Sequence, residues 1–352
     1  MSRTWRCAVV GVGTVGEWHV RTLPQIPGAQ LVALCDLQPE KCTAALDKNK
    51  LPHVPVYADQ FEMLKNEQID VIHVCTPSGN HMDPVLMALE AGKNVICEKP
   101  MEIHLDRIDQ LIAAARRNKV RLAGIFQNRW NPANRALKDA AVQGRFGRIG
   151  WAGCFTPWYR DDRYYEEGGW RGTWKLDGGG AIMNQSVHAV DLLQWIVGPV
   201  RQVSAYGASR IHGKIEVEDT LSCALQFANG AFGTIMGSTA MYPGGHVRVE
   251  VGGENGTACT EGGLKTYKFR DEHAQDKALL EELSGGQKTT GGGSSATEVA
   301  LDLHGENSQH LLDAWAEGKD ADTAASEARK AVAIILAMYE SVRNNGAPVQ
   351  LG

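Results

Sequence analysis

The sequence predicts an α/β domain with a parallel sheet, followed by an α+β domain with a mostly antiparallel sheet. In residues 1–126, short apolar runs alternate with segments of helical periodicity, which is typical of a parallel sheet covered by helices. Beyond them, longer stretches alternate apolar and polar side chains, which favours antiparallel strands. A chain of 352 residues is long enough for two cores, so we place the domains at residues 1–126 and 127–352.

The elements of the first domain are expected to be short and regularly spaced. Apolar runs rich in β-branched residues predict strands at residues 7–10, 31–35, 71–75, 95–97 and 121–125. Apolar residues at helical spacing predict the helices between them, at residues 17–23, 39–48, 81–91 and 105–118. Right-handed crossovers between parallel strands then determine most of the topology.

The second domain is expected to open with a helix at residues 132–143. An Asn229-Gly230 pair between two alternating runs is a strong hairpin signal. The strands predicted around and after it are residues 219–227, 231–239, 247–251 and 257–260. Residues 284–295 are rich in Gly, Ser and Thr and predict a loop. The amphipathic run 326–344 predicts a final helix.

Composition and charge exclude several classes of protein. The formal net charge is −5 and no basic run occurs, which argues against a nucleic-acid partner. No stretch approaches the roughly 20 apolar residues of a membrane span, and the start lacks a secretory pattern, so we expect a cytoplasmic protein. The eight cysteines are scattered, without zinc-like spacing, so we interpret them as reduced core residues and expect no metal.

A glycine-rich turn follows the first predicted strand and precedes a predicted helix. Each glycine has its own purpose: Gly11 permits the tight turn, Gly13 lets backbone N–H groups approach a pyrophosphate, and Gly16 lets helix and strand pack closely. Thr14 and Val15 begin the helix, whose N-terminus favours phosphate charge. This pattern predicts a Rossmann-type dinucleotide site.

Asp36 ends the second predicted strand, twenty residues beyond Gly16. A carboxylate at this place accepts hydrogen bonds from the ribose hydroxyls and repels a 2′-phosphate. The next residue is Leu37 and not an arginine, which agrees with that selectivity. The sequence therefore predicts NAD as the cofactor in preference to NADP.

Three further motifs carry a family resemblance. Residues 76–81 read TPSGNH, and residues 98–100 read EKP. Residues 178–191 begin with three glycines and then contain Asn184, His188 and Asp191. Together with the glycine turn, they resemble the Gfo/Idh/MocA family of glucose–fructose oxidoreductase and inositol dehydrogenase-like enzymes. The resemblance extends over nearly the whole chain. The cofactor contacts that we predict beyond the glycine turn and Asp36 are Thr76, Pro77, Asn80, His81, Glu98, Lys99 and Gln127.

The resemblance implies an open-faced sheet domain that also makes oligomer contacts, so we expect a homodimer or homotetramer. It also implies that Lys99 and His188 flank the reacting carbon. Hydride transfer from an alcohol needs a base of near-neutral pKa, which suits histidine, and a cation that stabilises the alkoxide, which suits lysine. We assign His188 as general acid/base and Lys99 as the oxygen-binding cation, with the two roles open to exchange.

One residue departs from the inositol dehydrogenase-like pattern. Many such members carry aspartate four residues before the histidine, where this chain has Asn184. An amide can bind a substrate hydroxyl or the imidazole, but it cannot hold a cation by charge. We therefore expect a substrate other than plain inositol, and the Asn-Gln-x-x-His form resembles the branch that acts on C3 of sugars. Asp191 is expected to be structural, with orientation of His188 as the alternative.

Aromatic and cationic residues concentrate in residues 157–175, after an arginine at position 129 that follows the last strand of the first domain. Aromatic faces pack on sugar rings, and arginine binds hydroxyls, carboxylates or phosphates. An oligomer interface favours the same residue types and is an equal alternative. The predicted substrate contacts are Lys99, Arg129, Trp158, Tyr159, Arg160, Trp170, Arg171, Asn184 and His188, with Tyr164 and Trp174 as further candidates.

These observations predict an NAD(H)-dependent oxidoreductase that acts on a hydroxyl or ketone, with C3 as the expected carbon, of a sugar or sugar derivative. Three alternatives stay open. The substrate could be a UDP-linked amino-sugar uronate, whose diphosphate Arg160, Arg163 and Arg171 could bind. The enzyme could retain NAD through one glycoside-processing cycle. A non-enzymatic dinucleotide-binding regulator of sugar metabolism has the same fold, but it has no need for Lys99 and His188.

Overall fold

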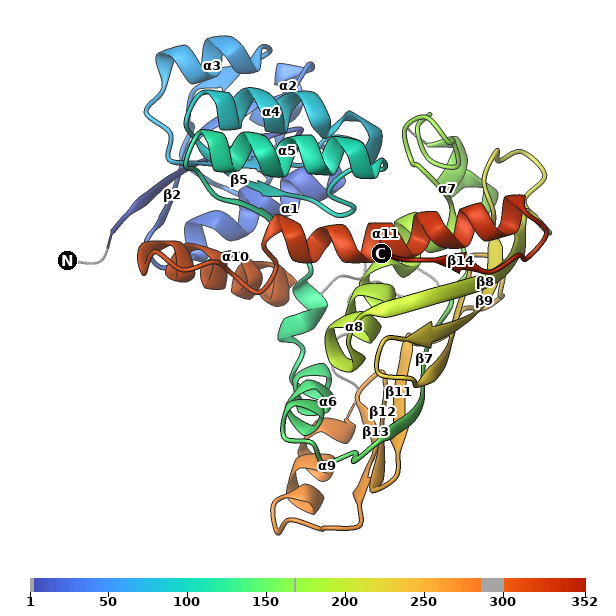
Figure 1. Cartoon of the computed structure of the whole chain (residues 1–352). Helices are drawn as coiled ribbons and strands as arrows, with labels where there is room; N and C mark the ends of the chain where they lie inside the picture. The colour runs from blue at the N-terminus through green and yellow to red at the C-terminus, as the bar shows by residue number, and fades with distance from the viewer. Residues whose placement is uncertain (1–2, 168, 286–300) are drawn as a thin grey trace. The chain divides into compact units, whose positions relative to one another are not determined.

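The computed structural model describes residues 3–167, 169–285 and 301–352 (Figure 1). Contacts within the chain divide it into two units. Unit 1 comprises Met1–Gln127 and Leu301–Arg329, and unit 2 comprises Asn128–Ala300 and Lys330–Gly352. The sequence division placed residues 301–329 in the second domain, whereas their contacts lie with unit 1 because a late helix completes its core.

Unit 1 contains a six-stranded parallel sheet with the strand order β3-β2-β1-β4-β5-β6, which is the doubly wound order. The strands are β1 Trp5–Val10, β2 Ala29–Cys35, β3 Val56–Tyr57, β4 Val71–Val74, β5 Asn94–Cys97 and β6 Leu122–Gly124. All five predicted strands are present. The sixth, β3, has two residues, which is too short to produce a pattern in the sequence.

The helices of unit 1 flank this sheet (Figure 1). They are α1 Thr14–Thr22, α2 Pro39–Lys48, α3 Gln60–Asn66, α4 Met82–Glu90, α5 Leu105–Arg117 and α10 Leu301–Ala316, with 3-10 turns at Leu23–Gln25 and Ser78–Asn80. The four predicted helices are confirmed within a few residues at their ends, and α3 and α10 were missed. Helix α10 packs on α1, and Leu311 and Leu312 enter the same apolar core as Trp5. The Trp5 and Trp315 rings meet edge to face, with centroids 6.5 Å apart.

Unit 2 contains an eight-stranded, mostly antiparallel sheet in the order β13-β12-β11-β7-β10-β9-β8-β14. Only the pairing of β10 with β7 is parallel among the described strand pairs of this sheet. The strands are β7 Ile149–Pro157, β8 Val200–Ala208, β9 Thr220–Phe227, β10 Phe232–Ser238, β11 Arg248–Gly253, β12 Gly256–Glu261, β13 Leu264–Phe269 and β14 Val349–Gln350. The predicted hairpin is β9–β10.

Helices α6 and α8 lie on one face of this sheet (Figure 1). The opposite face carries exposed aromatic side chains, including Tyr206 and Phe232. The helical segments that include residues of unit 2 are η3 Gln127–Trp130, α6 Pro132–Val142, α7 Asp162–Glu166, a π-helical turn at Ala181–Ser186, α8 Val187–Val197, α9 Asp276–Ser284 and α11 Ala325–Arg343. Of the predicted loop 284–295, Ser284 ends α9, and residues 286–295 lie outside the described residues.

The cysteines and the helices give two further findings. All eight cysteines are unpaired thiols; seven are buried and Cys75 is half-buried. No described helix has the length and apolar character needed to span a bilayer.

Candidate active site

The carboxyl ends of the parallel strands gather the predicted cofactor residues at one edge of the unit 1 sheet. Val10 of β1 lies in register with Cys35 of β2 and Val74 of β4, and Val74 with Cys97 of β5. The residues that follow these strands therefore lie along one edge, where doubly wound sheets bind their ligands. They include Gly11, Asp36, Thr76 and Lys99.

The glycine turn leaves no room for side chains where the backbone segments meet. A Cβ on Gly11 would lie 2.8 Å from the Thr76 nitrogen, and one on Gly16 would lie 1.9 Å from the Gly11 oxygen. The φ of Gly11 is +86°, which favours glycine. A Cβ on Gly13 would meet nothing within 4 Å, so the space above the start of α1, at Thr14 and Val15, is open. A turn of this shape fits a pyrophosphate on the helix N-terminus.

Asp36 is half-buried and bonds to the same turn. Its Oδ2 accepts from the Val12 N–H at 2.7 Å, and its Oδ1 accepts from the Gln38 N–H at 2.9 Å. The carboxylate is thus held in place beside the glycine turn, where a ribose is expected. The neighbouring Leu37 side chain is 90% exposed.

His81 ties two loops of this edge together. Its Nε2 lies 2.8 Å from the Thr76 oxygen, and its Nδ1 lies 2.9 Å from the Pro100 oxygen. The ring is buried, and burial lowers its pKa. Thr76 also donates to the Asn80 oxygen at 3.1 Å, which closes the first loop beside Pro77. His81 therefore acts on the shape of the loops, and its direct contact with a cofactor stays a prediction.

Glu98 points into the core of unit 1, although the lysine after it is half-buried. His19 Nε2 donates to Glu98 Oε1 at 2.8 Å, His304 Nε2 lies 3.9 Å from the same oxygen, and the Lys99 N–H donates to Oε2 at 3.1 Å. Burial alone raises the pKa of Glu98, but the His19 contact outweighs it and the pKa falls to about 2. Burial lowers the pKa of His19, and its contacts with Cys75 and Glu98 outweigh this and raise it to about 10.

Gln127 follows β6 and begins a short 3-10 turn. Its side chain is buried, and the oxygen Oε1 has no hydrogen-bond partner among the described residues. Buried polar atoms are nearly always paired. An oxygen in this state fits the ligand contact that the sequence predicts for Gln127.

Asn184 and His188 lie in one continuous helical segment of unit 2. Asn184 belongs to the π-helical turn Ala181–Ser186, and His188 belongs to the first turn of α8; both are buried. The four-residue step from Asn184 to His188 begins in this π-helical turn, which is wider than an ordinary α-helical turn. Such turns are rare and frequently occur at functional sites.

Asp177 fixes the orientation of the Asn184 amide. Its Oδ1 accepts from Asn184 Nδ2 at 2.5 Å, and its Oδ2 accepts from the Gly172 N–H at 2.8 Å. A carboxylate accepts only, so the amide nitrogen must face it. The Asn184 oxygen is therefore directed elsewhere, and it accepts from Gln185 Nε2 at 3.2 Å. Sequence reasoning missed Asp177, although a carboxylate at the start of the glycine-rich segment was a usable signal.

Four successive N–H groups at the start of this segment bond to two residues from elsewhere in unit 2. Glu218 accepts from Gly180 at 3.0 Å and Ile182 at 2.9 Å through its carboxylate, and from Ala181 at 3.0 Å through its backbone oxygen. The Tyr339 hydroxyl accepts from the Met183 N–H at 3.3 Å and donates to Glu218 at 2.9 Å. Burial raises the pKa of Glu218 to about 7, although these donors oppose the shift. Glu218 and Tyr339 were not among the site residues predicted from the sequence.

Arg160, Tyr164 and Arg171 gather around Gln185, next to Asn184. Gln185 Nε2 donates to the Tyr164 hydroxyl at 2.6 Å, and Arg160 Nη2 donates to Gln185 Oε1 at 3.2 Å. The Tyr164 ring lies under both guanidinium groups, 5.5 Å from Arg160 and 4.6 Å from Arg171. Arg160 is buried, and burial lowers its pKa. Unit 2 thus brings a cationic, aromatic group of residues beside Asn184.

Arg129 is bound to Asp191 in the interior of unit 2. Its Nε and Nη2 donate to the two carboxylate oxygens at 2.7 and 2.6 Å, and both side chains are 1% exposed. This bidentate pair agrees with the structural role expected of Asp191. Arg129 thus has an internal partner, and its contact with a substrate stays a prediction.

The other aromatic candidates in residues 157–175 differ in burial and in the side chains that they contact. Trp158 is buried under the Arg160 guanidinium, 4.9 Å away, and Tyr159 packs edge to face on Tyr242. Trp170 is half-buried beneath Arg171, and Trp174 is 45% exposed.

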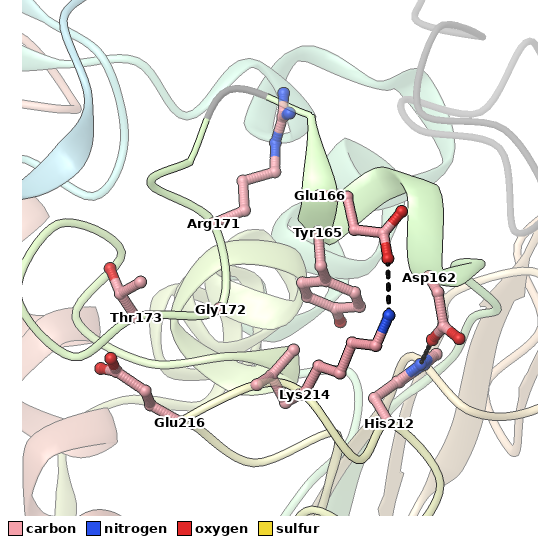
Figure 2. A pocket seen from close by; sticks show the side chains of 10 residues that line it. Asp162, Tyr165, Glu166, Arg171, Gly172, Thr173, His212, Lys214 and Glu216 are labelled. Atoms are coloured by element: carbon pink, nitrogen blue, oxygen red, sulfur yellow. Dashed lines mark hydrogen bonds and ion pairs between the residues drawn. The ribbon is translucent and has the colours of Figure 1, made fainter.

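A pocket opens beside Arg171 (Figure 2). Lys214 points to Glu166, with an ion pair of 3.0 Å, and His212 points to Asp162, with a pair of 2.9 Å. The volume of the pocket is about 120 Å³. Pockets for drug-sized ligands span about 300–1,000 Å³. This pocket is therefore too small for a nucleotide-linked sugar, and we assign it no substrate.

The chain is similar to known oxidoreductases over both of its units. Residues 5–126 match an oxidoreductase family with an NAD-binding Rossmann fold, and residues 134–259 match the GFO/IDH/MocA C-terminal domain. Myo-inositol 2-dehydrogenase from Thermotoga maritima is 28% identical, over 71% of this chain and 73% of that protein.

Two solved structures are similar over almost the whole chain. The WlbA dehydrogenase from Bordetella pertussis, in complex with NADH and UDP-GlcNAcA, is 31% identical with a TM-score of 0.89, and the match covers 99% of this chain and 98% of that one. The WlbA dehydrogenase from Chromobacterium violaceum, with the same two ligands, is 30% identical with a TM-score of 0.88, over 100% and 97% of the chains. With the glycine turn, Asp36 and the two-unit fold, these matches show that the chain belongs to the GFO/IDH/MocA family of NAD-binding oxidoreductases.

Proposed function

We propose that the chain oxidises the C3 hydroxyl of a UDP-linked amino-sugar uronate, or reduces the matching ketone, with NAD(H). The observation that carries the substrate class is the likeness, over 99% of the chain, to a dehydrogenase in complex with NADH and UDP-GlcNAcA. The group around Arg160 supports it, because a buried guanidinium beside Asn184 offers a cation to a carboxylate.

Each site residue has a proposed role. The nicotinamide supplies the hydride chemistry when NAD is bound. His188 takes the proton of the alcohol, since an imidazole exchanges protons near neutral pH. Lys99 donates to the substrate oxygen and stabilises the charge that develops on it. Asn184 offers its carbonyl oxygen to a sugar hydroxyl, because Asp177 holds the amide nitrogen.

A substrate panel tests the proposed function. NADH formation is measured with UDP-GlcNAcA, with UDP-GlcNAc, which lacks the carboxylate, and with myo-inositol. We expect the highest kcat/KM for UDP-GlcNAcA, and reduction of the product with borodeuteride should place deuterium at C3. Faster oxidation of UDP-GlcNAc or inositol would refute the substrate class, and label at another carbon would refute the position. If none of these substrates gives NADH, the proposed function itself is refuted.

The Arg160→Met variant tests how the uronate is bound. A charge-assisted hydrogen bond lost from a buried site costs about 1.5–3 kcal/mol, so we expect KM for UDP-GlcNAcA to rise about 10- to 100-fold. KM for UDP-GlcNAc should rise little, because that substrate has no carboxylate. Arg201→Met, at an exposed position on β8, is the matched control and should leave KM unchanged. An equal rise in KM for both substrates would show that Arg160 does not bind the carboxylate.

The Asp36→Ala variant tests cofactor selection. The carboxylate repels a 2′-phosphate and accepts from the ribose hydroxyls, so its removal should narrow the preference for NAD over NADP. The ratio of kcat/KM for the two cofactors is the measurement. Asp59→Ala, on the exposed N-cap of α3, controls for loss of a nearby negative charge. An unchanged ratio in Asp36→Ala would mean that selectivity arises elsewhere.

We further propose that the enzyme works in the cytoplasm as a homodimer or homotetramer. The exposed aromatic residues on the open face of the unit 2 sheet, among them Tyr206 and Phe232, support self-association, because aromatic residues are enriched at interfaces. Sedimentation of the purified protein measures the oligomeric state, and a monomer at micromolar concentration would contradict this expectation.

A further inference from the structure

We propose that Glu218 and Tyr339 are positioning residues that cap the helical segment carrying Asn184 and His188, and so set the placement of both site residues. The inference deepens the proposed function and rests on it for its catalytic consequence. It concerns only unit 2, since all four residues lie there.

A helix begins with four N–H groups that have no partner within the helix. In most helices a Ser, Thr, Asp or Asn side chain at the N-cap satisfies one of them. Here the N-cap is Gly180, which has no side chain to do so. The acceptors come from Glu218, two residues before β9, and from Tyr339 of α11. Glu218 and Tyr339 together accept from all four N–H groups of residues 180–183.

The fit between the cap and the segment is tight. A Cβ on Gly180 would lie 1.9 Å from the Glu218 backbone oxygen, and a Cβ on Gly179 would lie 2.1 Å from the Tyr339 hydroxyl. The two caps also contact each other, through the hydrogen bond from the Tyr339 hydroxyl to Glu218. This cap therefore explains Gly179 and Gly180 of the sequence motif, since a side chain at either position would push the acceptors away from the N–H groups.

The capped turn is the part of the segment that determines where Asn184 lies. The turn is π-helical over Ala181–Ser186, which is wider than an α-helix and rare in proteins. Ser186 Oγ donates to the Ala181 oxygen at 2.8 Å, which closes the turn directly before His188. A shift at residues 180–183 would thus move Asn184 and the start of α8 together.

Trp174 connects the cap to the cationic, aromatic segment. Its ring packs edge to face on Tyr339, with centroids 5.3 Å apart, and its backbone N–H donates to Glu216 Oε2 at 3.0 Å. Asp177, between Trp174 and the glycines, holds Asn184. The cap therefore contacts Trp174, three residues before the Asp177 that holds Asn184.

The test compares Glu218→Gln and Tyr339→Phe with the matched controls Glu261→Gln and Tyr267→Phe; Tyr267 is a buried tyrosine on β13. Misplacement of reacting groups by about 1 Å can cost about 10²-fold in rate. We expect kcat to fall about 10- to 100-fold in the two cap variants, KM for NAD to stay unchanged, and the controls to keep wild-type kinetics. Amide exchange over residues 180–188 should become faster in the cap variants and not in the controls.

A double-mutant cycle separates positioning from a general loss of structure. If Glu218 acts through His188, then Glu218→Gln should cost little further activity in a His188→Ala background. Equal losses of kcat in both backgrounds would overturn the inference, as would unchanged exchange over residues 180–188. If Glu218→Gln does not fold, Tyr339→Phe gives the same readouts. Exchange needs no substrate, so it tests the cap even if no sugar is oxidised and the proposed function fails.

Discussion

Replacing Lys99 with methionine or His188 with alanine should each lower kcat by about 10²–10⁴-fold, while NAD binding remains nearly unchanged. Methionine keeps the length of the lysine side chain and removes the cation that stabilises the developing oxygen charge. Alanine removes the proton acceptor. Steady-state kinetics with UDP-GlcNAcA give kcat, and fluorescence titration with NADH gives cofactor affinity.

Two controls make this result specific. Lys93→Met, on the loop before β5, removes a lysine far from the carboxyl edge and should not change kcat. His53→Ala removes an exposed histidine and should be equally silent. If either site variant turns over close to the wild-type rate, that residue is not part of the chemistry. Exogenous imidazole that restores His188→Ala would add direct support for proton transfer.

Removal of Asp191 should destabilise the protein by about 3–5 kcal/mol, because Asp191→Ala leaves the Arg129 charge buried without its carboxylate. Both side chains are fully buried, so water cannot compensate for the loss. The midpoint of urea unfolding, followed by tryptophan fluorescence, measures the change. Asp109→Ala breaks the exposed pair with Arg329 and should shift the midpoint little.

The double variant Arg129→Met, Asp191→Leu tests what Arg129 is for. Apolar side chains of similar volume can replace a buried ion pair with little loss, so stability should recover toward wild type. If Arg129 serves only the fold, KM for the sugar should stay at the wild-type value in this variant. A folded double variant with a strongly raised KM would restore the substrate contact that the sequence predicted for Arg129.

The sequence predicted the elements whose causes are local. Strand β1, the glycine turn and α2 have strong patterns of their own, and their bounds were close to those found. Strand β3 was missed because it has two residues and is held by pairing with β2. Strands β7 and β8 were missed because their glycines and polar residues weaken the alternation on which the prediction depends.

The residues of the candidate site also fall into two groups, those that local sequence patterns predicted and those that they did not. Gly11 and Asp36 each follow a strand at the spacing of a dinucleotide site, and Lys99 lies in the Glu-Lys-Pro motif that carries the family resemblance, so short motifs were enough to find them. The partners of the glycine-rich segment could not be found in this way. Glu218 and Tyr339 are separated from that segment by 36 and 156 residues in the hydrogen bonds that they make. Tyr339 lies in the predicted final helix, but a helical pattern does not indicate which distant N–H group a side chain will bind. Only folding brings such groups together.

The place of α10 in the unit 1 core bears on how the protein is made. The first 127 residues leave the ribosome early, but Leu311, Leu312 and Trp315, which pack in the core with Trp5, are synthesised near the end. The nascent chain must therefore keep an incomplete apolar surface until most of unit 2 has been translated. A protein that ends at residue 127 would lack α10 and would leave this apolar surface exposed to solvent.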